Sequence, residues 1–292
     1  MQVHRNAAAS DDDRKFAKCL LCDIAMKEVY NMGSKKHLHY LSQMITRNFL
    51  PKDGSHTFLQ YNPAKEKIEP RNIDRLFSRY KPWSQEFEEF LGGNTYENKM
   101  GPLLKELVCL PIKRPFIYKR NGIEEAQFYA ETITEEEKQK LLSKLLLQTI
   151  LLQRSDEKPQ SDVESELEQL FLSGFALKFH LLLVEINPRY ICPPLILTDG
   201  MVFEFICPDD NKKSLGHLGF MFPISEKRFL LWVSQRSDYT YFCAKYKNIN
   251  YLNLCRIEQH DKKCTIALAK TEYNEIYLKS LIREIPFFSS SE

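Results

Sequence analysis

The sequence predicts an α+β protein in which a helix-rich N-terminal two-thirds packs on a mainly antiparallel sheet, formed mostly by the C-terminal third. Before Pro188, apolar residues recur mostly at the three- and four-residue spacing of amphipathic helices. After Pro188, short runs of β-branched and aromatic residues alternate with turn residues, as in strands. Because helices come first and strands later, this order is typical of α+β proteins and differs from a repeating βαβ pattern.

Capping and helix-breaking residues bound the elements expected in the first part of the chain. Asp11 to Asp13 can cap a first helix, Pro51 ends a second, and Gly92-Gly93 interrupts a third. From the N-terminus we expect helices over 14–32 and 41–50, a hairpin of 56–62 with 67–68, a short helix near 73–77, and a helical stretch over 84–107.

The second part of the chain changes from helices to strands. Two long helices are expected near 124–153 and 161–186, and the capping-box pattern at 134–137 indicates a point where the first can restart. We then expect strands over 191–199, 201–207, 218–224 and 228–235, a helix over 246–259, a strand over 264–269 and a helix over 271–283. The early hairpin is expected to join the sheet of these strands.

Composition is that of an ordinary globular protein. The 292 residues are 43% hydrophobic and 27% charged, which excludes a disordered or collagen-like chain and allows a sizeable core. We expect one α+β domain over 1–292. Its parts are an N-terminal helical extension (1–34), a motif region with a hairpin and a helix (35–123), a helical segment (124–187) and a β-rich C-terminal part (188–292).

The sequence predicts a cytoplasmic protein without a membrane partner. The first 16 residues lack the apolar core of a secretory signal. The apolar run 144–152 is interrupted by Gln148, and the run 176–186 carries Lys178 and Glu185, so neither is suited to span a bilayer. In that compartment we expect the 8 cysteines to be reduced.

Charge is distributed unevenly along the chain. Residues 124–168 hold 12 acidic and 5 basic side chains, whereas residues 212–283 hold 13 basic and 6 acidic ones. One interpretation is two solvated faces, or halves that attract each other within the molecule. The other is a basic region at 212–283 that binds phosphate, which would make nucleic acid a partner. No run of lysine and arginine exceeds two residues, and this favours the first interpretation.

The stretch KKHLHYLSQMITRNF, residues 35–49, resembles the opening motif His-His-Tyr-Val-Pro-Gln-Phe-Tyr-Leu-x-x-Phe of a widespread bacterial family known only as a domain of unknown function. His39 and Tyr40 match the His-Tyr pair, Gln43 matches the Gln, and Phe49 matches the closing Phe. Ser42 stands where the family has Pro, and His37 is out of register with the first His.

Later motifs extend the resemblance over most of residues 35–268. Glu97 matches the glutamate of an acidic helix in that family, and Thr198-Asp199 take the place of its Thr-Ser-Asp motif, without the proline that follows there. Residues 222–225, FPIS, resemble its Phe-Pro-Leu-Ser motif. The resemblance implies a bacterial protein, an architecture and candidate positions, but no reaction.

Two metal-binding hypotheses concern the N-terminal region. Cys19, Cys22, His37 and His39 could form a tetrahedral zinc site. However, the cysteines fall inside the expected helix 14–32, and the His-x-His spacing is tighter than zinc motifs use, so we favour the helix over zinc. The histidines could also belong to a metal-dependent nuclease hairpin with a histidine base, although a helix is expected directly after them.

A third constellation is dispersed along the chain: His39, Gln43, Glu97 and Asp199. His39 and Gln43 are four residues apart, which would place them on one face of a helix that begins there. Asp199 ends an apolar strand, a position that often carries function. Two carboxylates with a histidine and a glutamine could hold a divalent metal ion or perform acid–base chemistry. Equally, these residues could cap helices and turns or make buried hydrogen bonds.

Two classes of function follow from these patterns. The first is a hydrolase acting on nucleic acid or another phosphodiester, of toxin or defence type, with His39, Gln43, Glu97 and Asp199 as catalytic residues. The second is a non-enzymatic module that binds a protein partner. The sequence contains no Gly-x-Gly-x-x-Gly, Walker or Gly-x-Ser-x-Gly motif, so the common nucleotide-binding and serine-hydrolase classes are not favoured.

Overall fold

A computed structural model describes twelve ranges of the chain: 38–39, 43–51, 56–79, 90, 93–112, 115–120, 123–154, 160–174, 178–187, 191–208, 216–260 and 264–288. The chain divides into two units, residues 39–78 with 83–292 and residues 1–38 with 79–82. All the described helices and the strands of the two larger sheets belong to the first of these units. The helix expected over 14–32 and the first part of the helix expected over 84–107 lie outside the described residues.

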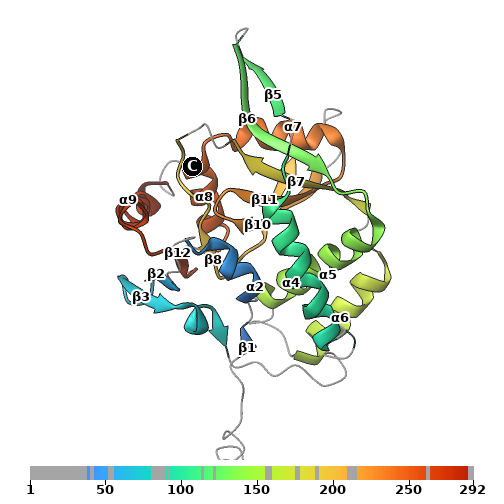
Figure 1. The fold of residues 1–292 in the computed structure, drawn as a ribbon, viewed down its shortest axis with the longest axis horizontal. Coiled ribbons are helices and arrows are strands. Elements are labelled where there is room, and N and C mark those ends of the chain that lie inside the picture. Colours follow the sequence, from blue (N-terminus) through green and yellow to red (C-terminus); the bar gives the residue numbers. More distant parts are fainter. Residues whose placement is uncertain are drawn as a thin grey trace, which may run out of the picture. The chain divides into compact units, whose positions relative to one another are not determined.

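The predicted α+β class is confirmed, and the larger of its sheets has six strands (Figure 1). Every neighbouring pair in this sheet is antiparallel, in the order β5-β6-β7-β11-β10-β9. The strands are β5 (Pro115–Arg120), β6 (Ile123–Thr132), β7 (His180–Ile186), β9 (Phe203–Cys207), β10 (His217–Ser225) and β11 (Arg228–Val233).

A second, four-stranded antiparallel sheet has the order β3-β2-β12-β8. Its strands are β2 (Thr57–Asn62), β3 (Lys67–Asn72), β8 (Leu197–Thr198) and β12 (Ile266–Ala269). The expected hairpin is therefore present, and it pairs with a C-terminal strand, but in a different sheet from β9, β10 and β11. The short strands β1 (Leu38–His39) and β4 (Ser78–Arg79) each lie at a boundary between the two units.

The helices begin close to several of the expected signals. α4 starts at Gly93, at the predicted Gly-Gly break, and α5 starts at Glu136, two residues after Thr134. The described helices are α2 (Gln43–Thr46), α4 (Gly93–Cys109), α5 (Glu136–Arg154), α6 (Gln160–Leu172), α7 (Arg236–Lys245), α8 (Ile249–Glu258) and α9 (Glu272–Phe288), with short 3-10 helices η2 (Arg47–Phe49) and η3 (Ile73–Arg75).

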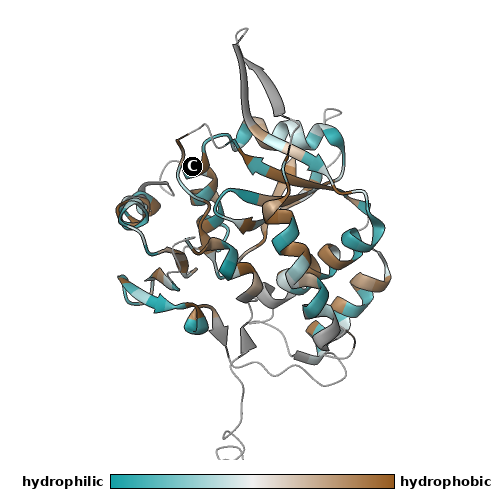
Figure 2. Ribbon diagram, in the orientation of Figure 1, coloured by the Kyte–Doolittle hydropathy of each residue, from teal (hydrophilic) through white to brown (hydrophobic). Residues whose placement is uncertain are grey.

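The six-stranded sheet is covered on both faces. In β11, Leu230 and Trp232 pack in one core with side chains of α4, α5 and α6, whereas Phe229 and Leu231 pack in another with α7 and α8. All six residues of β11 are buried. A strand that is buried on both faces has a continuous apolar sequence, as FLLWV, residues 229–233, has here. Figure 2 shows this hydrophobic centre between more polar outer surfaces.

A third core lies between the smaller sheet and the C-terminal helices. Leu59 and Leu268 from the sheet meet Leu254 of α8 and Leu281 of α9. α8 therefore contributes to two cores, because Leu252 packs in the core of the larger sheet. This helix links the two sheets, and the polar residues on it are correspondingly buried.

Two predicted helices were wrong in part, because each includes a strand. Residues 123–132 form β6, and residues 180–186 form β7, where helices were expected near 124–153 and 161–186. In IEEAQFYAET, Ala126, Phe128 and Ala130 recur at every second position, as in a strand, and HLLLVEI is a short apolar run that periodicity cannot assign. Since β5, β6 and β7 precede residue 188, the expected division into N-terminal helices and a C-terminal sheet is not confirmed.

Helix α7 was not predicted. Its sequence, RSDYTYFCAK, places its apolar residues side by side instead of repeating them at helical spacing. The structure shows why it is nevertheless helical: Asp238, at its third position, accepts a hydrogen bond from the backbone N–H of Gln235 across 2.9 Å. This contact satisfies one of the open amide groups at the start of a helix.

Candidate functional site

The structure places the four predicted site residues on four elements. His39 is in β1, Gln43 is the first residue of α2, Glu97 is in α4, and Asp199 directly follows β8. The side chains of His39, Gln43 and Glu97 lie outside the described part of the structure. The convergence of the four side chains therefore stays a prediction.

Three of these elements contribute to one hydrophobic core. Ile45 of α2, Met100 of α4 and Leu197 of β8 all belong to it. α2 also lies close against α4, since a methyl group added at Gly101 would come within 2.9 Å of the Met44 sulfur atom. The elements that carry Gln43, Glu97 and Asp199 thus contribute to the same hydrophobic core.

The described part of the candidate site is the turn Thr198-Asp199-Gly200. The Thr198 hydroxyl donates a hydrogen bond to the Gly200 carbonyl oxygen across 2.6 Å. The Asp199 backbone N–H donates to the Thr265 carbonyl oxygen across 3.2 Å. These contacts fix the backbone on both sides of Asp199. Asp199 itself is half-buried and directly follows the end of β8. A carboxylate on such a rigid backbone is suited to a functional site.

Arg256 of α8 supports this turn from inside the protein. Its side chain has no exposed surface, and it donates to the Ile196 carbonyl oxygen across 2.8 Å and to the Thr198 hydroxyl across 3.5 Å. Among the described residues, no carboxylate is paired with it, so backbone and hydroxyl dipoles replace its hydration. Burial lowers the pKa of Arg256 to about 10, and the guanidinium stays charged at neutral pH.

His260, four residues after Arg256, packs against the same turn. A methyl group added at Gly200 would collide with the imidazole ring, so only glycine allows this close approach. The His260 backbone N–H donates to the Ile257 carbonyl oxygen across 3.2 Å, just beyond the end of α8. The imidazole therefore lies against the backbone of the residue that directly follows Asp199.

Cys264 also lies close to Asp199 but is not suited to be a nucleophile. Burial, together with the negative charge of Asp199, raises the pKa of the Cys264 thiol to about 12. The thiol is therefore protonated at neutral pH, whereas a cysteine nucleophile needs the thiolate. The chemistry available at this turn is that of the carboxylate and the imidazole.

Sequence analysis missed Arg256 and His260. They follow Asp199 by more than fifty residues, and nothing in the sequence shows that α8 packs behind β8. Their spacing of four residues is the one local signal that connects them, although α8 ends at Glu258 and His260 lies in the turn that follows. No pattern of possible partners surrounds His260 in the sequence, so nothing there indicated a functional role for it.

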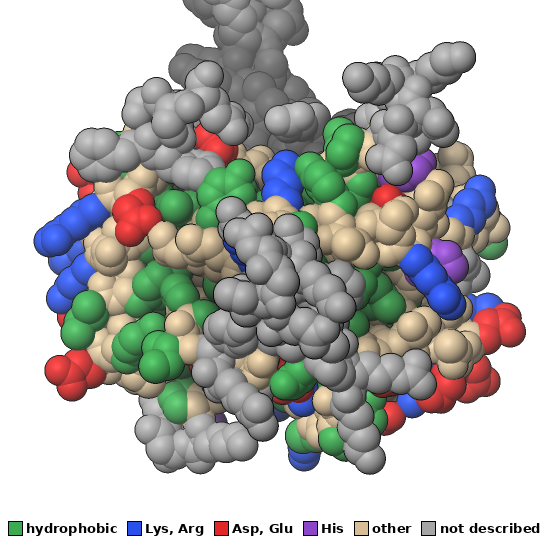
Figure 3. Space-filling view, turned by 90° about the horizontal axis from the view of Figure 1, so that it is seen from above, with side chains coloured by type: hydrophobic (Ala, Val, Ile, Leu, Met, Phe, Trp, Pro, Cys, Tyr) green, Lys and Arg blue, Asp and Glu red, His purple; other side chains and the backbone are tan. Residues whose placement is uncertain are grey.

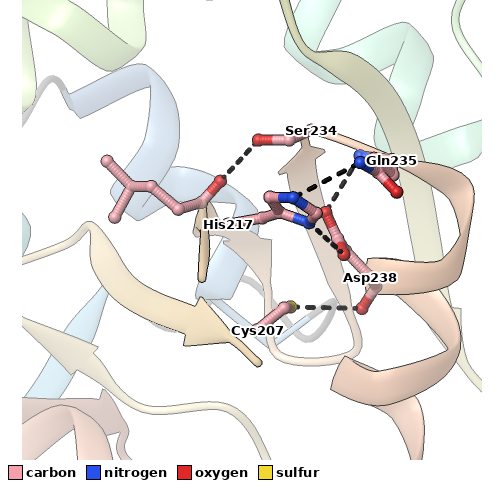
Figure 4. A network of polar contacts seen from close by, with 6 residues as sticks. Cys207, His217, Ser234, Gln235 and Asp238 are labelled. Carbon is pink, nitrogen blue, oxygen red and sulfur yellow. Dashed lines mark hydrogen bonds and ion pairs between the residues drawn. The ribbon is translucent and has the colours of Figure 1, made fainter. Parts of the chain in front are cut away.

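A second polar network joins β10 to α7 (Figure 4). His217 Nδ1 lies 3.3 Å from Asp238 Oδ1, and His217 Nε2 lies 3.3 Å from the Gln235 side-chain nitrogen. Both ring nitrogens thus have partners within the network. Cys207, opposite His217 on β9, donates its thiol to the Asp238 carbonyl oxygen across 3.7 Å, and burial raises its pKa to about 12. We interpret this network as an anchor that holds the start of α7 on the sheet.

The metal hypotheses and the basic region are tested only in part. The described residues contain no group of three or more histidine, cysteine, aspartate or glutamate side chains that could hold a metal ion. Cys19, Cys22 and His37 lie outside those residues. On the face seen in Figure 3, lysine and arginine side chains are dispersed among hydrophobic, acidic and uncharged ones, not gathered into one patch.

Helices long and apolar enough to cross a membrane are absent from the part of the chain that the structure describes. No protein-family model, curated protein or solved structure matches the sequence. The resemblance to the bacterial domain of unknown function stays a prediction on the residues that carry it.

Proposed function

We propose that the protein is a hydrolase of nucleic acid or a related phosphodiester, of toxin or defence type, with its active site around Asp199. The observation that supports this best is the Thr198-Asp199-Gly200 turn, where a half-buried carboxylate stands on a fixed backbone beside His260. The core shared by α2, α4 and β8 supports the participation of Gln43 and Glu97. His39 precedes α2 by a few residues.

The proposed reaction needs a base for water and an acid for the leaving oxygen. Water attacks phosphorus, its proton passes to a carboxylate or imidazole, the phosphorus–oxygen bond breaks, and the departing oxygen takes a proton. Asp199 and Glu97 would supply the base or the oxygen ligands that a divalent cation prefers, and His39 would supply the acid. Gln43 would orient the phosphate through its amide. Arg256 would hold the turn in place through its hydrogen bond to the Thr198 hydroxyl.

The first experiment is an assay of Asp199→Asn on single- and double-stranded DNA and RNA, with magnesium or manganese and with a chelator. The amide keeps the size of the side chain and removes its charge, so hydrolysis should fall at least a hundredfold while the urea midpoint changes little. Asp162→Asn is the matched control, because Asp162 is an exposed aspartate in the first turn of α6. Full hydrolysis by Asp199→Asn would contradict the proposal.

His39 is tested by a second pair of variants. If His39 is catalytic, His39→Ala should abolish hydrolysis and change the free energy of unfolding by less than about 1 kcal/mol. If His39 is instead buried and has a structural role through its hydrogen bonds, the same change should lower the free energy of unfolding by about 1 to 3 kcal/mol. Tyr40→Phe is the control, since it keeps the aromatic volume. A destabilised His39→Ala protein with full specific activity would end the catalytic interpretation of His39.

The alternative, a module that binds a protein partner, is favoured by a different observation. β9 is an edge strand of the six-stranded sheet, and its Ile206 lies directly opposite Leu218 of β10. These side chains are 59% and 36% exposed, so two large apolar groups lie side by side at a sheet edge. Exposed apolar groups at an edge are suited to contact another chain.

The two functions give different results in one comparison. If the edge is the functional surface, Ile206→Ser with Leu218→Ser should abolish partner binding or self-association in sedimentation velocity, and Asp199→Asn should not. If the hydrolase proposal is correct, the reverse pattern should be seen in the nuclease assay. Leu172→Ser is the control, because Leu172 is another exposed leucine, on α6.

A further inference from the structure

The outward face of α7 combines cations, hydroxyl groups and an aromatic ring. Asp238, Phe242 and Cys243 are buried on its inner side. Six residues on the opposite, outward side of the helix, spaced three or four positions from one another, are exposed or half-buried. They are Arg236, Ser237, Thr240, Tyr241, Ala244 and Lys245. We call these six residues the α7 face.

No acid lies on the α7 face. The single carboxylate of the helix, Asp238, is 4% exposed and is engaged by Gln235 and His217. Two exposed lysines on other helices are, by contrast, paired with a neighbouring acid: Lys140 binds Glu136, and Lys279 binds Glu275. Among the described residues, neither Arg236 nor Lys245 has such a partner. The α7 face is therefore a place where cations remain available to an external anion.

Aromatic rings hold the cation at the C-terminal end of this face. The Lys245 ammonium lies 5.7 Å from the centre of the Tyr241 ring and 5.3 Å from that of Tyr246. Tyr246 in turn stacks on Tyr251 of α8, with ring centres 6.1 Å apart. Tyr246 is buried and Tyr241 is half-buried, so Tyr241 presents ring surface beside the lysine. A cation beside an accessible aromatic ring is what proteins use to bind a nucleotide's phosphate and base together.

We infer that the α7 face binds single-stranded nucleic acid, with phosphates on Arg236 and Lys245 and a base against Tyr241. The two cations are nine residues apart, which is about 13 Å along the helix axis and half a turn around it, so they lie at opposite edges of the α7 face and a strand of a few nucleotides would cross the face diagonally between them. Ser237 and Thr240 lie between them and supply hydroxyl donors of the kind that bind phosphate oxygens. The His217–Asp238 anchor keeps the face in place on the sheet. This inference rests on the proposed function for its class of ligand, but it uses none of the residues proposed to be catalytic.

The test measures binding in the full chain carrying Asp199→Asn, so that hydrolysis does not interfere. Fluorescein-labelled oligothymidylate is titrated by fluorescence anisotropy at several salt concentrations. Arg236→Gln with Lys245→Gln should weaken binding at least tenfold at low salt and reduce the slope of log affinity against log salt by about 1.4, or about 0.7 for each lost phosphate contact. Tyr241→Leu should weaken binding about tenfold and leave the slope unchanged.

The matched control is Lys140→Gln with Lys279→Gln, which removes two exposed but ion-paired lysines and should leave affinity nearly unchanged. Equal loss in the control and in the α7 variants would overturn the inference, because it would show attraction by overall charge alone. Tighter binding of a duplex through Arg236 and Lys245 would overturn the single-strand assignment. Loss of binding in the α7 variants, without any hydrolysis by the unaltered protein, would support this surface and contradict the hydrolase proposal.

Discussion

Arg256 donates a hydrogen bond to the backbone carbonyl oxygen of Ile196 across 2.8 Å, from a side chain with no exposed surface. The contact joins α8 to the segment that leads into β8. It also holds a charge in the interior, at a place where an apolar side chain would leave the carbonyl without a donor. The geometry of the Asp199 turn therefore depends on a residue that makes no contact with solvent.

Arg256→Met should cost about 1 to 3 kcal/mol of unfolding free energy, because it keeps much of the volume but leaves the Ile196 carbonyl oxygen and the Thr198 hydroxyl without their donor. Arg256→Ala should cost about 3 to 5 kcal/mol, since a cavity is added. Urea denaturation measures both. Arg283→Met, at an exposed arginine of α9, should stay within about 0.5 kcal/mol. Equal stability of the Met and Ala variants would contradict this account of the packing.

Gly200→Ala should strongly destabilise the protein, because the added methyl group meets the rigid His260 ring. His260→Ala in the same chain should restore much of the lost stability by removing that ring. Gly101→Ala is the matched control: its methyl group would meet the flexible Met44 side chain within α2, which can give way, and alanine favours the helix. The melting temperatures of the three proteins distinguish these cases. A mild effect of Gly200→Ala would show that His260 does not pack on the turn.

Helices and strands were predicted correctly from the sequence where turn and capping residues mark their ends. The hairpin of β2 and β3, the start of α4 at Gly93 and the restart near Thr134 are set by turn and capping residues within a few positions. β7 was missed because HLLLVEI is buried by contacts with β6 and β11, which lie far away in the sequence. Arg256 and His260 were missed for the same reason. Their roles arise from the packing of α8 behind β8, which no local pattern indicates.

Stability should fall as pH rises from about 9 towards 10. The pKa of Cys207 and the pKa of Cys264 are both raised by burial from an ordinary value of 9.0 to about 12, so these thiols keep their protons when the unfolded chain has lost them. The folded state is then disfavoured progressively above pH 9. The lowered pKa of Arg256, about 10 against 12.5, acts in the opposite direction above pH 10, so the measurement should stop there.

Urea midpoints at several pH values between about 8 and 10 measure this slope. Replacing Cys207 and Cys264 together with alanine should reduce the slope, and Cys243, whose pKa burial also raises, should account for part of what remains. The midpoint itself should fall because buried volume is lost. Cys109→Ala, at an exposed cysteine, should leave the slope as it is. An unchanged slope in the double variant would show that other groups govern alkaline unfolding.

Asn253→Asp should destabilise the protein more at pH 8 than at pH 5. Asn253 is fully buried, and its amide nitrogen donates to the Pro194 carbonyl oxygen across 2.8 Å and to the Tyr277 hydroxyl oxygen across 2.9 Å. A carboxylate cannot donate, so its charge would face the Pro194 carbonyl dipole in a dry site. Burial would raise the pKa of the introduced carboxyl above its unfolded value, and stability would be retained at low pH and lost as pH rises through that pKa. We expect the free energy of unfolding to fall by about 3 kcal/mol or more at pH 8, measured by urea denaturation, and by less at pH 5.

Asn248→Asp is the control. Asn248 is an exposed N-cap of α8, and its side-chain oxygen accepts hydrogen bonds from the backbone N–H groups of Asn250 and Tyr251, a role that aspartate fills equally well. If both variants showed the same small, pH-independent change, the amide of Asn253 would not be the link between α8, α9 and the segment before β8.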